Sequence, residues 1–349
     1  MGKDKKIDIK FDHHLAEHKR KKVEVELEKG KKEEMSLDAL KSGGLIRQTQ
    51  KDKYTVRLRC PGGRLPFEKL KKIAEVAPKY SKGGYVHLSV RQSVEIPYVD
   101  FHDFPGLIED LKEVDQNIAS CGPRVRVPTA CSGCEYNPNG LIDTQKLCKE
   151  IDKRFFGVAC NHKFKIGLSG CPIDCVHSAN MDIGIQGAIE PEWLEDKCIG
   201  CRVCGIACRE GAITNDKETG RPSIDISKCL YCADCIRACP TEAWAEGRSG
   251  SMVRVGGKWG RHPLNSSTIA EFVPEEKLLD IIQKVLDWYH TYGKDRGRTR
   301  IGDILRSFWK EFVAYIKPVL GEYAVKNPAM PEHITIHPYQ KGWKAPEFK

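Results

Sequence analysis

The sequence predicts an α+β fold with several domains, and three observations support this prediction. The chain has 349 residues, enough for two or three domains with cores of their own. Alternating apolar and polar residues, typical of strands, occur near segments with helical apolar spacing. Twelve of the 16 cysteines fall into three groups, and two of these groups repeat one another within a single segment.

The first predicted unit covers residues 44–115 and contains short strands and two helices. Its first strand alternates apolar and polar residues until Pro61-Gly62-Gly63 ends it. The helix that follows carries Leu70, Ile73, Ala74 and Val76 on its apolar side. The sequence predicts strands at 54–59, 85–91 and 94–98, and a second helix at 104–114.

The second predicted unit begins near residue 119 and resumes after the paired cysteine groups. Asp143-Thr144 starts a helix that runs to Phe156, and residues 162–169 form a strand that enters the Gly170-Cys171 turn. A glycine-rich segment at 255–261 precedes two amphipathic helices near 275–291 and 301–317. The expected domains are a charged arm at 1–43, a half-domain at 44–118, a domain made of 119–192 and 248–322, an insert at 193–247 and a tail at 323–349.

The two paired cysteine groups share one spacing, C-x2-C-x2-C-x3-C, at an offset of 31 residues. In this arrangement three cysteines of one run hold a [4Fe-4S] cluster, and the fourth ligates the cluster of the other run. The insert is therefore predicted to be a ferredoxin domain with two [4Fe-4S] clusters. One cluster is assigned to Cys198, Cys201, Cys204 and Cys239, and the other to Cys229, Cys232, Cys235 and Cys208.

The sequence also bears on other classes of protein. Disulfides and paired zinc sites are the alternative interpretations of the cysteines, and the interlocked spacing disfavours both. No apolar run reaches the ~18 residues of a membrane span, and the charged N-terminus is unlike a signal peptide, so we expect a cytoplasmic protein. The net charge of +9 favours an anionic substrate or an acidic partner. Basic and acidic residues alternate, which argues against nucleic acid.

Five further segments, taken in order, resemble the siroheme-containing sulfite and nitrite reductases. They are Arg57-Leu-Arg59-Cys-Pro-Gly-Gly63, Ser89-Val-Arg91-Gln92, Arg126-Val-Pro-Thr-Ala-Cys131, Lys163-Phe-Lys165 and Gly170-Cys171-Pro-x-x-Cys175. The resemblance covers residues 54–320 and is nearest to dissimilatory and anaerobic sulfite reductase subunits with an inserted ferredoxin domain. It implies a ferredoxin-like half-unit followed by a domain that binds siroheme and a [4Fe-4S] cluster.

The resemblance also implies the ligands of a third cluster. These would be Cys131, Cys134, Cys171 and Cys175, with the Cys175 thiolate also bridging to the siroheme iron. Two departures from the family pattern stand out. Cys131-x2-Cys134 replaces the usual C-x5-C, and Ile173-Asp174 replaces the usual Asn between the last two cysteines.

The basic residues in these segments match the family's contacts to the anion and to siroheme. The resemblance implies catalytic roles for Arg57, Arg91, Arg126, Lys163 and Lys165. Sulfite is a small oxyanion, so fixed cations and proton donors suit its reduction. If residues 162–169 form a strand, Lys163 and Lys165 point to the same face. Arg124 is an alternative to Arg126.

Siroheme carries eight carboxylates, so its binding site should be basic. Candidate cofactor-binding residues are Arg59, Gly256, Gly257, Lys258 and Arg261, with Arg298 or Arg300 as further candidates. The two glycines would let backbone amides approach the cofactor.

The resemblance implies six-electron reduction of sulfite to sulfide, with electrons supplied by an electron-donor protein through the insert. Nitrite reduction and a non-catalytic electron-transfer subunit remain alternatives. The family builds its active site from two related halves, and this chain holds one. We therefore expect a homo-oligomer or a pairing with a related sulfite reductase subunit.

Overall fold

The computed structural model describes residues 22–28 and 31–335. Contacts within the chain separate two compact units: residues 1–129 with 152–164, and residues 130–151 with 165–349. Within the described ranges, no helix combines the length and hydrophobicity needed to cross a bilayer.

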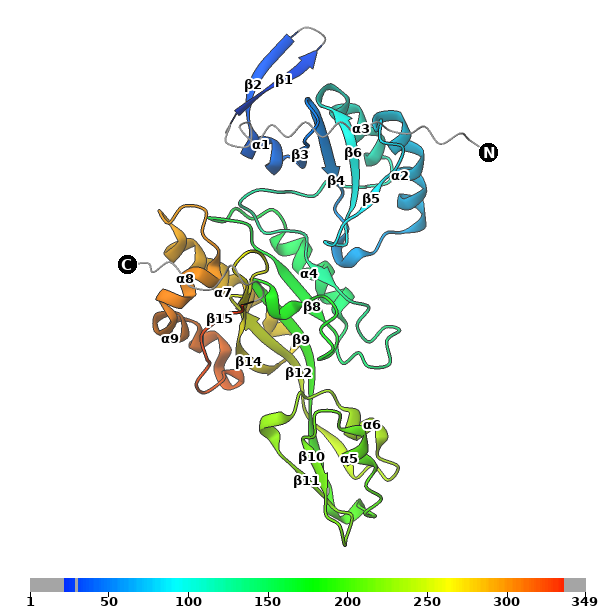
Figure 1. The fold of residues 1–349 in the computed structure, drawn as a ribbon, viewed down its shortest axis with the longest axis vertical. Helices are drawn as coiled ribbons and strands as arrows, with labels where there is room; N and C mark the ends of the chain where they lie inside the picture. The colour runs from blue at the N-terminus through cyan, green and yellow to red at the C-terminus, as the bar shows by residue number, and fades with distance from the viewer. Residues whose placement is uncertain (1–21, 29–30, 336–349) are drawn as a thin grey trace. The chain divides into compact units, whose positions relative to one another are not determined.

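The first unit is built on a four-stranded antiparallel sheet in the order β3-β4-β6-β5 (Figure 1). Its helices carry apolar residues at helical spacing, and Ile73, Val76, Leu107 and Leu111 are buried in one core with strand residues such as Val56. The elements are β3 Leu45–Arg47, β4 Lys53–Arg57, α2 Phe67–Tyr80, β5 His87–Leu88, β6 Val94–Asp100 and α3 Phe104–Lys112.

The first unit differs from the sequence prediction in three places. Within the predicted arm, β1 (Lys22–Glu28) and β2 (Lys31–Ser36) form a hairpin that leads into helix α1 (Leu37–Ser42), while residues 1–21 lie outside the described ranges. Of the strand predicted at 85–91, only the two residues of β5 pair. Of the residues predicted for the apolar side of α2, Leu70 is 48% exposed and Ala74 is exposed as well.

The second unit contains a five-stranded sheet in the order β14-β12-β9-β8-β7. Strands β8 and β9 are parallel, whereas β12 is antiparallel to both of its neighbours, β9 and β14. Helix α4 crosses the division between the units, and Asp143 caps its N-terminus by accepting the N–H groups of Gln145 and Lys146. The elements are β7 Thr129–Ala130, α4 Thr144–Phe155, β8 Ile166–Ser169, β9 Ile183–Trp193, β12 Trp244–Val255 and β14 Ser267–Val273.

Three helices complete the second unit. The expected helix at 275–291 is α7 (Glu275–Gly293), but the one expected at 301–317 is two helices, α8 (Ile301–Ser307) and α9 (Trp309–Leu320). The break falls at Phe308, whose ring lies 5.4 Å from that of Tyr292. In the predicted tail, β15 (Glu332–His333) pairs with β13 (Leu264–Asn265), and residues 336–349 lie outside the described part of the chain.

Strands β9 and β12 run side by side and bracket the paired cysteine groups (Figure 1). Their pairing starts at Trp193 and Trp244, so residues 194–243 form a distinct excursion, which we call the insert. Its elements are α5 Val203–Ala207, β10 Ile213–Asn215, β11 Pro222–Ile224 and α6 Asp234–Ala238.

The backbone of the insert repeats at the same 31-residue offset as its cysteines. Helix α5 corresponds to α6, and both follow a residue in the left-handed region, Arg202 (φ 66°) and Ala233 (φ 63°). Gly200 (φ 69°) and Tyr231 (φ 58°) form a second matched pair. The two cysteine runs therefore adopt the same local conformation, including positive φ values that non-glycine residues rarely take.

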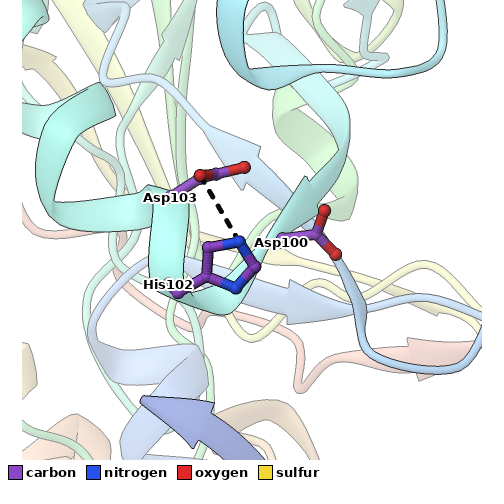
Figure 2. A group of neighbouring side chains, drawn as sticks. All are labelled: Asp100, His102 and Asp103. Carbon is purple, nitrogen blue, oxygen red and sulfur yellow. Dashed lines mark ion pairs between the residues drawn. The ribbon is translucent and has the colours of Figure 1, made fainter. Parts of the chain in front are cut away.

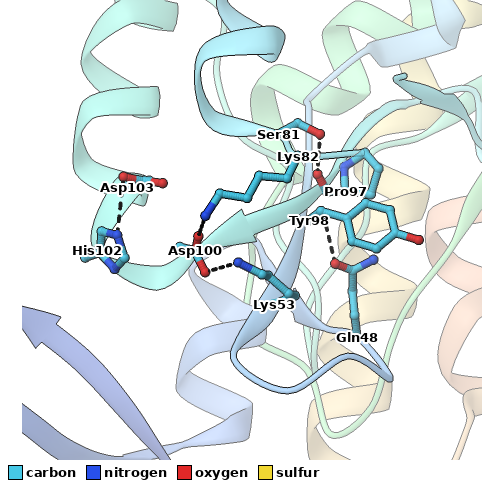
Figure 3. A network of polar contacts seen from close by, with 9 residues as sticks. All are labelled: Gln48, Lys53, Ser81, Lys82, Pro97, Tyr98, Asp100, His102 and Asp103. Atoms are coloured by element: carbon cyan, nitrogen blue, oxygen red, sulfur yellow. Dashed lines mark hydrogen bonds and ion pairs between the residues drawn. The ribbon is translucent and has the colours of Figure 1, made fainter. Parts of the chain in front are cut away.

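One small polar cluster in the first unit has the residue types of a metal site. Asp100, His102 and Asp103 lie together at the end of β6 (Figure 2). However, the Asp100 carboxylate pairs with the ammonium groups of both Lys53 and Lys82 (Figure 3). Two cations already neutralise it, so this cluster is an ion-pair network that joins β4 and the segment after α2 to the end of β6.

We expect Asp100→Asn to destabilise the protein near neutral pH and to have less effect in acid. Burial opposes ionisation of Asp100, but Lys53 and Lys82 outweigh it and lower its pKa. The stabilisation is therefore present above the unfolded pKa and is lost as the pH falls below about 4. Denaturant unfolding of wild type, Asp100→Asn and the control Asp103→Asn at pH 7 and pH 3 measures this. A pH-independent difference would contradict it.

Candidate metal centre and active site

The first cysteine group lies where two neighbouring strands end. Cys131 directly follows β7, and Cys171 follows β8 after a single glycine. The crossover from β8 to the parallel strand β9 contains both Cys171 and Cys175. The side-chain groups of Thr144 and Gln145 in the first turn of α4 donate to the Cys131 carbonyl, at 2.7 and 2.8 Å. The strands and the start of α4 thus fix the backbone of the group.

Backbone amides converge on the Cys131 sulfur. The N–H groups of Gly170 and Gly133 donate to its Sγ at 3.0 and 3.4 Å. Gly133 has φ +63°, and a Cβ there would lie 2.7 Å from the Thr144 hydroxyl. A Cβ on Gly170 would lie 2.9 Å from the Gly133 Cα. The short Cys131-x2-Cys134 turn therefore packs against the Cys171 turn because both glycines lack side chains.

Asp174 organises the loop between Cys171 and Cys175. It has φ 53°, a conformation that Asp tolerates better than most residues. Its carboxylate accepts from the Ser169 hydroxyl at 2.6 Å and from the N–H groups of Ser178 and Ala179 at 2.7 and 3.1 Å. The residue that departs from the family pattern is thus the one that closes the loop.

We expect Asp174→Ala to loosen this loop, because three hydrogen bonds to a charged acceptor are lost, each worth about 1.5–3 kcal/mol. Native-state hydrogen exchange should show faster exchange at Ser178 and Ala179. The control is Asp216→Ala, in the insert. The Asp216 carboxylate also accepts three hydrogen bonds, from the N–H groups of Glu218 and Thr219 and from the Thr219 hydroxyl. Unchanged protection at Ser178 in Asp174→Ala would refute the role assigned to Asp174.

Cys208 of the first run in the insert lines the same cavity as Cys229, Cys232 and Cys235 of the second run. Burial raises the pKa of Cys229, and the charge of Cys208, from the other run, raises it further. Burial and the neighbouring thiols of Cys232 and Cys229 raise the pKa of Cys235 to about 12. As free anions such thiols would repel one another, so a bound cation would be needed to hold them together as thiolates.

A cavity of about 240 Å³ joins this set to the first group. Its lining includes Cys208, Cys229, Cys232 and Cys235 from the insert, and Cys171 with Ile173 from the first group. The insert is anchored beside this cavity, because the Ile189 N–H donates to the Tyr231 carbonyl and the Tyr231 ring lies 5.0 Å from that of Phe272. Four thiols around one cavity fit a cluster of four irons.

The spacing of the thiols also bears on zinc. Thiolates on one tetrahedral zinc lie about 4 Å apart, given a Zn–S bond of about 2.3 Å. Among the described residues, three possible metal ligands, Asp100, His102 and Asp103, have ligand atoms that all lie within 4.8 Å of one another. No three of the described cysteines have all their sulfur atoms within 4.8 Å of one another.

Four of the five basic residues predicted to be catalytic belong to the first unit. Arg57 on β4 pairs with Glu95 at 2.6 Å and donates to the Cys121 sulfur at 3.5 Å. Arg91 donates to the Val127 carbonyl and Arg126 to the Gly122 carbonyl, each at 2.8 Å. The arginines are thus held by specific acceptors. Lys163 is half-buried just before Phe164.

Lys165 is the fifth predicted residue and belongs to the second unit. The strand predicted at 162–169 is wrong in its first half, because β8 begins at Ile166 and both Lys163 and Lys165 precede it. Between the two lysines, Phe164 is buried and forms an isolated bridge with Val125, and both lysines are half-buried. Lys165 is held by its backbone, whose N–H donates to Asp182 at 2.7 Å.

Several predicted cofactor-binding residues have structural partners. Arg59 pairs with Asp152 at 2.8 Å and stacks on Phe156, and Lys258 pairs with Asp303 at 2.5 Å. The further candidate Arg300 forms a buried two-fold ion pair with Asp182, at 2.6 and 2.9 Å. The charges of these three residues are balanced within the protein, as Glu95 balances that of Arg57.

The glycine-rich segment packs against the protein. The Gly256 N–H donates to the Asp182 carbonyl at 2.9 Å, so it is not available to a cofactor. A Cβ on Gly257 would lie 2.6 Å from the carbonyl oxygens of Ala179 and Met181. Gly257 therefore allows this segment to lie against the loop after Cys175, whereas a Cβ on Gly256 would lie 2.6 Å from Cγ of Pro331. Arg261 is exposed.

Sequence reasoning missed three residues that shape the site: Asp174, Asp182 and Arg237. Asp174 carried a signal, since an Asp between turn residues favours a left-handed, side-chain-capped bend. Asp182 carried none, because its partner Arg300 lies 118 residues away. Arg237 pairs with nearby Asp234, but its place beside Cys171 could not be inferred from local sequence.

Comparisons with known proteins agree with this architecture. The family model "Nitrite and sulphite reductase 4Fe-4S domain" matches residues 121–321, and "Nitrite/Sulfite reductase ferredoxin-like half domain" matches residues 46–114. The coenzyme F420-dependent sulfite reductase of Methanocaldococcus jannaschii is 31% identical over 86% of this chain and 48% of its own length. The chain thus spans about half the length of that relative.

Two further comparisons point the same way. A subunit of the anaerobic sulfite reductase of Salmonella typhimurium is 27% identical over 67% of this chain and 73% of its own length. The crystal structure of dissimilatory sulfite reductase I has the same fold, with a TM-score of 0.61 at 19% identity over 79% of this chain and 72% of that one. From its two matching domain models, this chain belongs to the nitrite and sulphite reductase family.

Proposed function

We propose that this chain is a subunit of a siroheme-dependent sulfite reductase that reduces sulfite to sulfide with six electrons. Cys131, Cys134, Cys171 and Cys175 would hold a [4Fe-4S] cluster, and Cys175 would also contact the siroheme iron. Siroheme, when bound, would supply an iron with an open position for the substrate. The insert would carry two further [4Fe-4S] clusters. We propose that the protein works in a reducing cytoplasm, where thiols persist.

The observation that carries this proposal is the cavity shared by the insert and the first cysteine group. Cys171 lines it together with Cys208, Cys229, Cys232 and Cys235. Of the two predicted insert clusters, the one held by these four thiolates would therefore be the neighbour of the first group. Such an arrangement supports electron delivery from the insert to the site of reduction.

The basic residues would bind the oxyanion and supply protons. Arg57 and Arg91 present planar guanidinium groups that suit an oxyanion, and Glu95 holds Arg57 in place. Lys163 and Lys165 would donate protons toward departing oxygens as water forms. The family's two-half active site supports a pairing with a second copy or with a related subunit.

Turnover with sulfite and with nitrite tests the proposal. The complex should be purified without oxygen, reduced with a low-potential viologen and assayed for sulfide and ammonia. We expect sulfide from sulfite, and we expect Arg91→Gln to lower turnover more than Arg248→Gln, a surface arginine paired with Glu190. If the protein produced ammonia from nitrite but no sulfide from sulfite, we would conclude that nitrite is the substrate. No product from either anion would support a non-catalytic subunit.

A further inference from the structure

The two halves of the insert differ at one matched position. Arg237 in α6 corresponds to Ile206 in α5 through the 31-residue repeat. Ile206 is 83% exposed, whereas the Arg237 side chain is 35% exposed and lines the cavity with Cys171. The matched position is therefore occupied by a cation, Arg237, in the half that lines the cavity with the first cysteine group, and by an apolar residue, Ile206, in the other half.

Arg237 is held in a defined position. Its Nη2 donates to the Cys232 carbonyl and to the Asp234 carboxylate, both at 2.7 Å. Its charge also reaches the first group. Arg237 and Cys171 line the same cavity. One guanidinium thus lies beside cysteines of two separate groups.

Asp234 brings an opposing charge to the same place. Asp234 lines the same cavity as Cys232 and Cys235. Arg237 balances Asp234 through their ion pair. Removing Arg237 would leave Asp234 as an uncompensated negative charge beside the cavity, and removing Asp234 would leave Arg237 as an uncompensated positive charge.

We infer that Arg237 and Asp234 form a charge pair that sets the reduction potentials on both sides of the cavity. The inference rests on the proposed function, because it takes clusters to be held by Cys208, Cys229, Cys232 and Cys235 and by the first group. A reduced cluster carries one more negative charge than an oxidised one. A nearby cation stabilises the reduced form and raises its potential, and an anion does the reverse.

The test is a redox titration of the anaerobic full-length protein, followed by electron paramagnetic resonance. Arg237→Gln should lower the midpoint potential of the neighbouring clusters, and Asp234→Asn should raise it. At a fixed potential near the midpoint, the reduced-to-oxidised ratio should change by about tenfold in each direction, about 59 mV for one electron. Arg237→Lys, which keeps the charge, should stay close to wild type.

Arg202→Gln is the matched control. Arg202 lies between Cys201 and Cys204 in the other run and donates to the Lys217 carbonyl. Its loss should shift the cluster assigned to Cys198, Cys201, Cys204 and Cys239 and leave the other two unchanged.

The outcomes separate the inference from the proposed function. Opposite shifts in Arg237→Gln and Asp234→Asn support the inference, even if one variant also loses some iron. Intact clusters with no shift, or with shifts in the same direction, would overturn the inference and leave the proposed function standing. Wild-type protein that holds no iron-sulfur clusters under anaerobic purification would overturn both.

Discussion

The Cys171→Ser variant is expected to lose one cluster, about four iron atoms per chain, and with it all turnover. Cys171 is buried, follows β8 directly after Gly170, and neighbours the thiols of Cys131 and Cys175. A serine hydroxyl is a poor ligand for iron-sulfur clusters, which select soft thiolates. Iron and acid-labile sulfide content should fall by about a third, because two of three predicted clusters remain.

Cys160→Ser provides the matched control for this prediction. Cys160 is half-buried outside all three groups, and its thiol faces the Val158 carbonyl at 3.6 Å. The iron content of the Cys160→Ser variant should equal that of wild type. If Cys171→Ser also kept the full iron content, the first group would not hold a cluster.

Arg300→Leu is expected to lower the free energy of unfolding of the second unit by about 3–5 kcal/mol. Arg300 and Asp182 pair with almost complete burial, at 7% and 0% side-chain exposure. The loss of Arg300 leaves a buried carboxylate without its cation. Asp182 also accepts the Lys165 N–H, so a shift of the unpaired carboxylate would also disturb the backbone just before β8.

Arg248→Leu is the matched control for this second prediction. Arg248 pairs with Glu190 in a similar two-fold geometry, but its side chain is 60% exposed. Exposed pairs contribute about 0–1 kcal/mol. Denaturant unfolding monitored by tryptophan fluorescence measures both variants. An Arg300→Leu effect as small as that of Arg248→Leu would contradict the role of the buried pair.

Local patterns in the sequence predicted much of the fold. The helix at Thr144 follows from its Asp143 cap, and the core faces of α2 and α3 follow from apolar spacing. The 31-residue cysteine repeat is matched by a 31-residue repeat of backbone conformation. In each case the interacting groups lie within a few residues of one another or repeat at a fixed offset. Such features can be predicted from the sequence alone.

Interactions between distant residues were not predictable in this way. Asp182 and Arg300 are 118 residues apart, so their ion pair leaves no local signal, and Arg300 was a cofactor candidate on charge alone. The Gly256 amide was expected to face a cofactor but donates to Asp182. The apolar spacing of 301–317 continues through Phe308, although the helix breaks there. Tertiary packing decided all three.

The absorption spectrum of the anaerobically purified protein tests the central claim most directly, namely that the first cysteine group serves a siroheme-coupled cluster. The account predicts siroheme bands together with broad iron-sulfur absorption, and a change in the siroheme bands when sulfite is added. Iron-sulfur absorption without siroheme bands, in wild-type protein with a full complement of clusters, would contradict it.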